Sequence, residues 1–183
     1  MAAIIRRNRQ KIVFPAPVLT GILLCMVHSQ ETRSKGTSQT RIGRYSGRSQ
    51  IYHVSTATFE RRAIFEVLRN GRIVVQAMRC VDTAGHTETM AYVVMPDHLH
   101  WLFQLTGDHS LSDSVCVVKS HSARLINALT RKKQKIWQRG FYDRAVRKDE
   151  DLLSIARYIV ANPLRAGIVD SVADYPLWDA KWI

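Results

Sequence analysis

The chain has 183 residues, of which 46% are hydrophobic, and this combination predicts a packed globular domain and excludes a largely disordered chain. Its 27 lysines and arginines outnumber its 15 acidic residues, and the resulting charge of +12 favours a polyanionic partner, nucleic acid first and an anionic membrane surface second. Three widely spaced cysteines without a CxxC pair exclude a zinc finger or a disulfide scaffold and favour a reducing, cytoplasmic location.

Residues 1–40 differ in composition from the rest of the chain. A basic start is followed by an apolar stretch over residues 12–27 and by a Ser/Thr-rich segment over residues 29–40. The outline is that of a secretory signal, but no small-x-small cleavage site follows, and no run of 18 apolar residues predicts a spanning helix. We expect residues 1–40 to be an extension, disordered or derived from a start codon assigned too early, and residues 41–183 to form the domain. The domain keeps +7 of the charge, so its basic character does not depend on the extension.

From residue 41 onward the sequence alternates between strand and helix patterns. Runs of β-branched and aromatic residues predict strands, helical spacing of apolar residues predicts helices, and Pro96-Asp97 predicts a hairpin turn. The expected strands cover residues 51–58, 87–95, 98–105 and 140–147, and the expected helices cover residues 62–80, with a possible interruption near Gly71, 110–129 and 149–164. The first six elements follow the order of a split βαβ unit. The sequence therefore predicts an α+β, ferredoxin-like fold with an antiparallel sheet.

His98 and His100 stand two residues apart in one of the expected strands. Side chains at this spacing point to the same face of a sheet, while Leu99 and Trp101 would point to the core on the other face. Two neighbouring imidazoles can hold one divalent metal ion through one nitrogen each. Alternatively, both histidines could be polar surface residues or could form structural hydrogen bonds, because a His-x-His pair by itself is not specific to a metal site.

Tyr158 and Asn162 stand four residues apart on the polar face of the last expected helix. Asn162 precedes Pro163, so the helix should end there and leave an amide oxygen one turn from the phenol. A surface tyrosine followed by an Asn-Pro helix stop would look the same, so this pair also leaves its function open.

Taken together, these segments resemble the HUH single-tyrosine transposases, and among them the branch of REP-associated tyrosine transposases. The likeness covers roughly residues 41–170 in the order of the family. The segments that carry it are Gly47–Val54, Ala91–Phe103, which includes Met-Pro-Asp-His-Leu-His-Trp, Trp137–Arg147 and Tyr158–Gly167. One departure is that Tyr45-Ser46-Gly47-Arg48 stands where the branch often has a Gly-Pro-Gly-like element used in reading DNA.

The resemblance implies the functional residues and the reaction. His98, His100 and Asn162 match the family's ligands for Mg²⁺ or Mn²⁺, and Tyr158 matches its nucleophile. A phenol with a pKa near ~10 is a poor nucleophile at neutral pH, so a metal ion that polarises the phosphate would assist the attack. The implied reaction is cleavage and rejoining of single-stranded, hairpin-containing DNA through a covalent tyrosyl-phosphate, as in DNA transposition.

Basic residues cluster before the last expected helix and suggest contacts to DNA phosphates, and Trp137 within the cluster could stack on unpaired bases. The residues expected to bind DNA are Arg48, Arg131, Lys132, Lys133, Lys135, Trp137, Arg139, Arg144, Arg147 and Lys148. Phe141 is expected to pack in the core. The protein would act as a monomer or a homodimer, without a membrane partner.

Three other interpretations remain open at this stage. The chain could be a domesticated, catalytically silent single-stranded-DNA-binding protein of the same fold. It could be a metal-dependent hydrolase that uses His98 and His100 without tyrosine chemistry, in which case Tyr158 is dispensable. It could also be a basic protein anchored to a membrane by residues 12–27.

Overall fold

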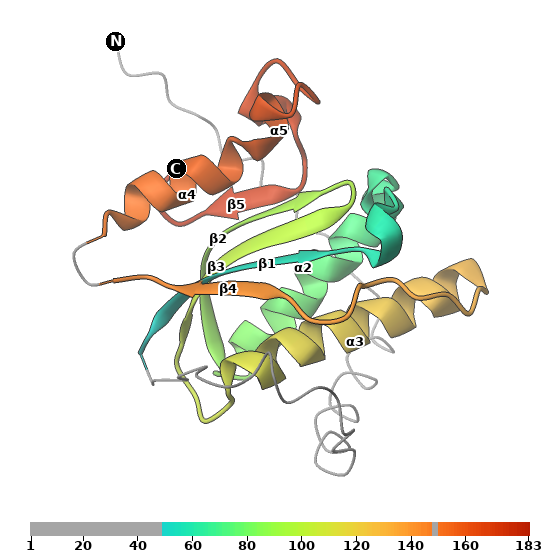
Figure 1. Cartoon of the computed structure of the whole chain (residues 1–183), viewed down its shortest axis with the longest axis horizontal. Coiled ribbons are helices and arrows are strands. Elements are labelled where there is room, and N and C mark those ends of the chain that lie inside the picture. The colour runs from blue at the N-terminus through green and yellow to red at the C-terminus, as the bar shows by residue number, and fades with distance from the viewer. Residues whose placement is uncertain (1–48, 148–149) are drawn as a thin grey trace. The chain divides into compact units, whose positions relative to one another are not determined.

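The computed structural model describes residues 49–147 and 150–183 (Figure 1). The proposed extension, Arg48 and Lys148 lie outside the described residues. One sheet with the strand order β4-β1-β3-β2-β5 forms the centre, and every neighbouring pair is antiparallel. Its strands are β1 Ile51–Ala57, β2 Thr87–Met95, β3 His98–Leu105, β4 Tyr142–Ala145 and β5 Trp178–Ala180. The predicted α+β class with an antiparallel sheet is confirmed.

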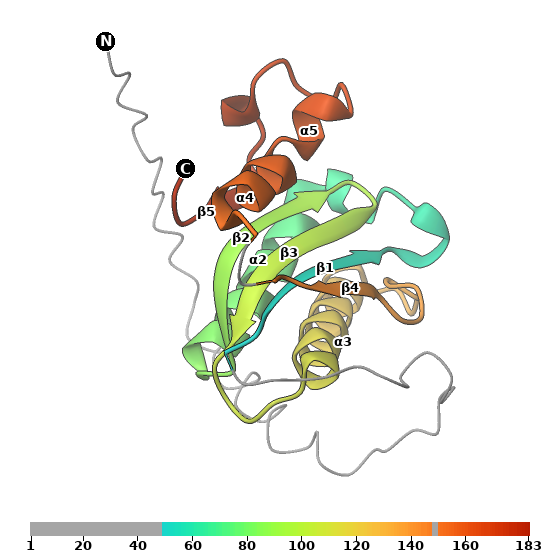
Figure 2. The same cartoon turned by 60° about the vertical axis from the view of Figure 1, so that its left-hand side comes forward.

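Helices cover both faces of this sheet. Figures 1 and 2 show α2 and α3 on one face and α4 on the other, where α4 lies along β2 and β5. The helices are α2 Leu68–Thr83, α3 Leu111–Thr130, α4 Leu152–Val160 and the short α5 Asn162–Arg165, and short 3₁₀ turns cover Phe59–Arg61, Ile64–Glu66 and Val172–Asp174. In the part of the chain that the structure describes, none of the helices combines the length and the apolar character needed to cross a bilayer.

Side chains along β3 alternate between the two faces of the sheet. Trp101 is fully buried on the α2–α3 face, opposite Val54 of β1 and Tyr92 of β2. His100 lies on the other face, opposite Ser55 of β1 and Val93 of β2. Because side chains alternate along a strand, the apolar core and the histidine pair come from the same eight residues.

The helices begin later than the sequence pattern predicted. The first expected helix starts at Leu68 and not at residue 62, because the preceding residues form a 3₁₀ turn whose Ile64 carbonyl accepts a hydrogen bond from the Asn70 side chain. Gly71 does not interrupt the helix. A Cβ atom at Gly71 would come within 2.3 Å of Leu177 Cδ1, so the glycine allows the C-terminal segment to approach closely.

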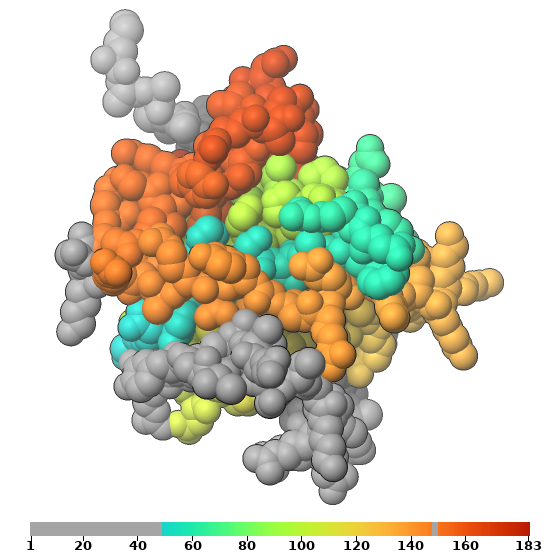
Figure 3. Space-filling view, viewed as in Figure 1, coloured from blue at the N-terminus to red at the C-terminus, as the bar shows by residue number. Residues whose placement is uncertain are grey.

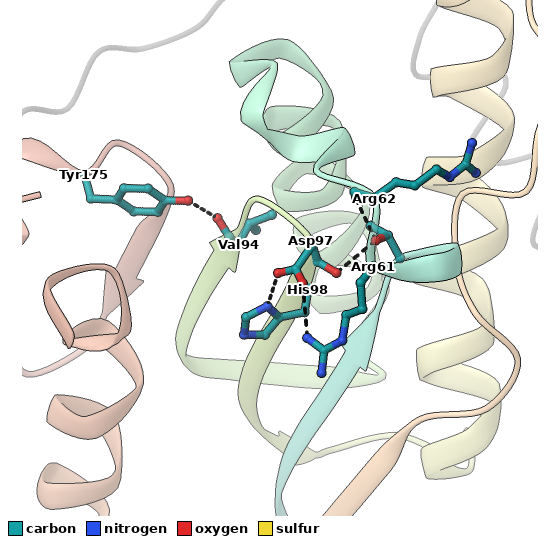
Figure 4. Close-up of polar contacts among 7 residues, drawn as sticks. Arg61, Arg62, Val94, Asp97, His98 and Tyr175 are labelled. Carbon is teal, nitrogen blue, oxygen red and sulfur yellow. Dashed lines mark hydrogen bonds and ion pairs between the residues drawn. The ribbon is translucent and has the colours of Figure 1, made fainter. Parts of the chain in front are cut away.

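The last expected helix, 149–164, is divided in two. It starts at Leu152, after Asp151 accepts a hydrogen bond from the Leu153 backbone N–H as an N-cap, and Ala161 separates α4 from α5. The chain then returns to the sheet as β5, a strand that the sequence analysis did not predict. Tyr175 fastens this segment by donating a hydrogen bond to the Val94 carbonyl over 2.7 Å, as Figure 4 shows.

Candidate active site

His98 is held by the turn that precedes its strand. Its Nδ1 lies 2.5 Å from Oδ1 of Asp97, while Oδ2 of Asp97 accepts a hydrogen bond from Arg61 over 3.2 Å (Figure 4). Burial alone would raise the pKa of Asp97, but the hydrogen bonds and charges of His98 and Arg61 outweigh it and lower the pKa. The carboxylate is therefore ionised at neutral pH and accepts a hydrogen bond from Nδ1 of His98. Nε2 of His98 is then the ring nitrogen that remains available to bind a cation.

His100 is held by a third histidine, which the sequence analysis did not single out. Nδ1 of His100 lies 3.2 Å from Nε2 of His53 on β1, whereas the rings of His100 and His98 are 4.9 Å apart between centroids. His53 pairs with Leu102 in the strand register, so it is the diagonal neighbour of His100 on the same face. We refer to His53, His98 and His100 as the histidine cluster.

Burial decides the charge of His53 and His100. It lowers the pKa of His100 to about 3, and the neighbouring His98, His53 and Arg61 contribute in the same direction. Burial, followed by the charge of Arg144, also lowers the pKa of His53. His53 and His100 are therefore neutral at pH 7, which is the state in which imidazole binds metal ions.

Tyr158 lies near the end of α4, on the side of the sheet that carries the histidine cluster, and Asn162 begins α5. The Tyr158 side chain keeps 48% of its surface exposed, and the Arg165 guanidinium lies 4.5 Å from the centre of its ring. The Asn162 Nδ2 donates to the carbonyls of Tyr158 and Ile159 over 3.0 and 2.9 Å. Both protons of the amide nitrogen are thus used at the helix end, which leaves its oxygen as the atom that could bind a cation.

The donor atoms of His98, His100 and Asn162 are of kinds that bind divalent cations. Within residues 49–147 and 150–183, no three His, Cys, Asp or Glu side chains are arranged to hold a metal ion. The atoms left available are two imidazole nitrogens and one amide oxygen, from His98, His100 and Asn162. Such a set suits Mn²⁺ or a similar ion that takes its other ligands from water or from substrate oxygens.

The basic side chains that we expected to bind DNA are mostly on the surface. Those that are described and exposed are Arg131, Lys132, Lys133, Lys135, Arg139, Arg144 and Arg147. Arg144 also forms an ion pair with Glu150 at 2.8 Å. Figure 3 shows β1 between α4 and β4 on one surface of the domain, so Arg144 on β4 lies near the histidine face.

The burial of Trp137 contradicts the prediction that its ring stacks on unpaired DNA bases. Its side chain is only 9% exposed, lies 4.9 Å from the ring of Phe65 and donates a hydrogen bond to Ser122 Oγ over 3.0 Å. A ring fixed in this way packs in the core and has no free face for a DNA base. Phe141 is partly buried against the same core, as expected.

Tyr142, the other tyrosine near the site, also lies on the histidine face. It is 67% exposed and stands opposite Ser55, which stands opposite His100. Strand register therefore brings a second phenol to this surface, which the spacing along the sequence did not reveal. Only Tyr158 has an amide oxygen one helical turn away.

Two curated proteins are similar to part of this chain. The chain is 33% identical over 99 residues to a candidate REP-associated tyrosine transposase of Haemophilus influenzae, covering 49% of this chain and 56% of that protein. It is 33% identical over 93 residues to the REP-associated tyrosine transposase of Escherichia coli K12, covering 49% of this chain and 52% of that protein. The chain thus matches about half the length of these curated relatives.

A solved structure and a family model extend the comparison. The fold is similar to that of a REP-associated tyrosine transposase bound to a REP hairpin, with a TM-score of 0.61, 24% identity and coverage of 74% of this chain and 79% of that chain. At this identity the likeness supports the fold. The model of the family described as transposase IS200 like matches residues 47–162, which include every strand and helix from β1 to α4. The chain therefore belongs to the IS200-like transposase family.

Proposed function

We propose that the protein cleaves and rejoins single-stranded, hairpin-containing DNA through a covalent bond between Tyr158 and a DNA phosphate. His98, His100 and Asn162 would hold a Mg²⁺ or Mn²⁺ ion, which supplies Lewis-acid polarisation of the phosphate when bound. The observation that carries the proposal is the His-x-His pair with both Nδ1 atoms engaged, on the same side of the sheet as an exposed tyrosine in a member of this family.

The proposed reaction follows from the exposed phenol. The Tyr158 oxygen attacks phosphorus and forms a phosphotyrosine bond, the bond to the neighbouring 3′ oxygen breaks, and the phenolic proton ends on that leaving oxygen. Attack by a 3′ hydroxyl on the phosphotyrosine reverses the step, so rejoining needs no nucleoside triphosphate. The Arg165 guanidinium, 4.5 Å from the Tyr158 ring, places a positive charge beside the nucleophile and would attract the phosphate.

The proposed substrate follows from the surface charge and from one relative. Phosphate contacts from the exposed arginines and lysines would bind a strand without reading its sequence. The solved relative is bound to a REP hairpin, and we extend a hairpin partner to this chain as part of the proposal. The chain would act as a monomer or a homodimer.

A denaturing gel of the protein with labelled single-stranded hairpin DNA and Mn²⁺ tests the proposal. The wild type and Tyr142→Phe should form a covalent adduct, whereas Tyr158→Phe, which keeps the ring but lacks the attacking oxygen, should form none. An adduct lost only in Tyr142→Phe would reassign the nucleophile. Cut DNA without an adduct would point to a hydrolase, and a mobility shift without cleavage would point to a DNA-binding protein that has lost its activity.

A further inference from the structure

The histidine cluster contains one ring more than the proposed metal site uses. His53 comes from β1, 47 residues before His100, and its Nε2 lies 3.2 Å from Nδ1 of His100. The contact is lateral within the sheet, because His53 is the diagonal neighbour of His100. Both side chains are partly buried. The matching atom of His98, Nδ1, is held by Asp97 at 2.5 Å.

Two proton arrangements are possible for a contact between two neutral imidazoles. If His53 Nε2 carries the proton, His100 Nδ1 accepts it and the remaining proton of His100 occupies Nε2. Both nitrogens of His100 are then engaged, and neither can bind a cation. If His100 Nδ1 carries the proton and donates it to His53, Nε2 of His100 keeps a free lone pair. Only the second arrangement agrees with His100 as a metal ligand.

We infer that His53 is a positioning residue for the metal site: it accepts the Nδ1 proton of His100 and so turns Nε2 of His100 toward the ion. This inference rests on the proposed function. His53 would do for His100 what Asp97 does for His98, and the two ligand rings would be held by different elements, β1 and the β2–β3 turn. Partners of this kind fix the tautomer and the orientation of a ligand, and their loss typically lowers metal affinity about 10- to 100-fold.

The tautomer can be measured in the metal-free protein, without any activity. In protein labelled with ¹⁵N in its histidine rings, long-range ¹H–¹⁵N spectra should show the proton of His100 on Nδ1. In His53→Ala this preference should be lost, whereas in His86→Gln, which changes a histidine outside the cluster, it should be retained. A wild-type spectrum with the proton on Nε2 of His100 would overturn the inference even if the variants fail to fold.

Metal titration separates this inference from the proposed function. Mn²⁺ affinity measured by calorimetry should fall about 10- to 100-fold in His53→Ala, and His53→Gln, whose amide oxygen can accept the same proton, should recover part of it. If His98→Ala and His100→Ala leave the affinity unchanged, the proposed metal site itself is wrong. If those two variants lose affinity and His53→Ala does not, only the role of His53 is wrong.

A direct ligand role for His53 is distinguishable as well. With Zn²⁺ as a diamagnetic probe, the nitrogens that acquire metal-bound chemical shifts should be Nε2 of His98 and Nε2 of His100. Appearance of that shift on Nε2 of His53 would make it a ligand and would overturn the positioning role.

Discussion

On β3, Trp101 and Phe103 point to one face of the sheet and are fully buried, whereas His98 and His100 point to the other face and keep part of their surface. The first face is closed by α2 and α3, and its contacts are aromatic and apolar: the two rings stack at 3.8 Å, and the indole N–H is satisfied by Thr89. The second face is covered by α4 along β2, while His53, Ser55 and His100 are only partly buried.

From this difference we expect one face of β3 to serve stability and the other face to serve the proposed chemistry. A side chain on the closed face contributes chiefly through burial, so its loss should lower the free energy of unfolding of the domain. A side chain of the histidine cluster is only partly buried. Its loss should therefore change metal affinity and the protonation of its neighbours more than the stability of the fold.

Trp101→Ala should destabilise the whole domain. Removing a fully buried indole leaves a cavity between the sheet and its helices and leaves Thr89 without its partner, at a cost of about 3–5 kcal/mol in the free energy of unfolding. Urea denaturation should show this loss. Gln104→Ala, on the opposite face of the same strand, should cost less than about 1 kcal/mol, and equal losses in both variants would contradict the separation of the faces.

His100→Ala should impair metal binding and DNA cleavage but should leave the stability of the domain nearly unchanged. We expect loss of the tyrosyl adduct and a fall in Mn²⁺ affinity at least as large as that in His53→Ala, because a proposed metal ligand is removed, while the unfolding midpoint in urea should change little. Asn162→Ala should be milder, since water can replace a neutral oxygen ligand. Calorimetric titration and the adduct gel measure the two effects. A His100→Ala protein that still cleaves DNA at the wild-type rate would refute a functional histidine face.

Acid should destabilise the metal-free protein through the histidine face. His100 has a pKa of about 3 when folded and an ordinary value of 6.5 when unfolded, because burial disfavours its charged form. The unfolded chain therefore takes up the proton first, and stability should fall as the pH drops below about 6.5, by about 2 kcal/mol at pH 5. Urea titrations at pH 7 and pH 5 should show a smaller fall for His100→Leu. Parallel losses in both proteins would contradict this assignment.

Deletion of residues 1–40 should have the smallest effect, both on the stability of the domain and on adduct formation. The match to the family model begins at residue 47, and the deletion removes only +5 of the +12 charge. A protein that starts at Arg41 should melt cooperatively and form the same adduct, with somewhat weaker DNA binding at low salt. Loss of cooperative melting would show that the proposed boundary at residue 41 is wrong.

Local patterns made much of the molecule predictable from its sequence. Strand alternation indicated that His98 and His100 share a face opposite Trp101, and the four-residue spacing placed Asn162 one turn after Tyr158. The motifs around these residues indicated the family. These features depend on neighbours along the chain, and the structure has them where the sequence predicted them, although α4 begins and ends within the expected helix.

Contacts between distant segments were decided only by the tertiary structure. No local pattern relates His53 to His100, 47 residues away, or predicts that Trp137 packs on Phe65. The three-residue strand β5 is too short to show a period, and it exists because β2 offers it an edge and Gly71 makes room for the adjoining Leu177. Local periodicity fixes which side chains share one face of a strand or helix. The packing of strands against helices fixes which of these faces come into contact.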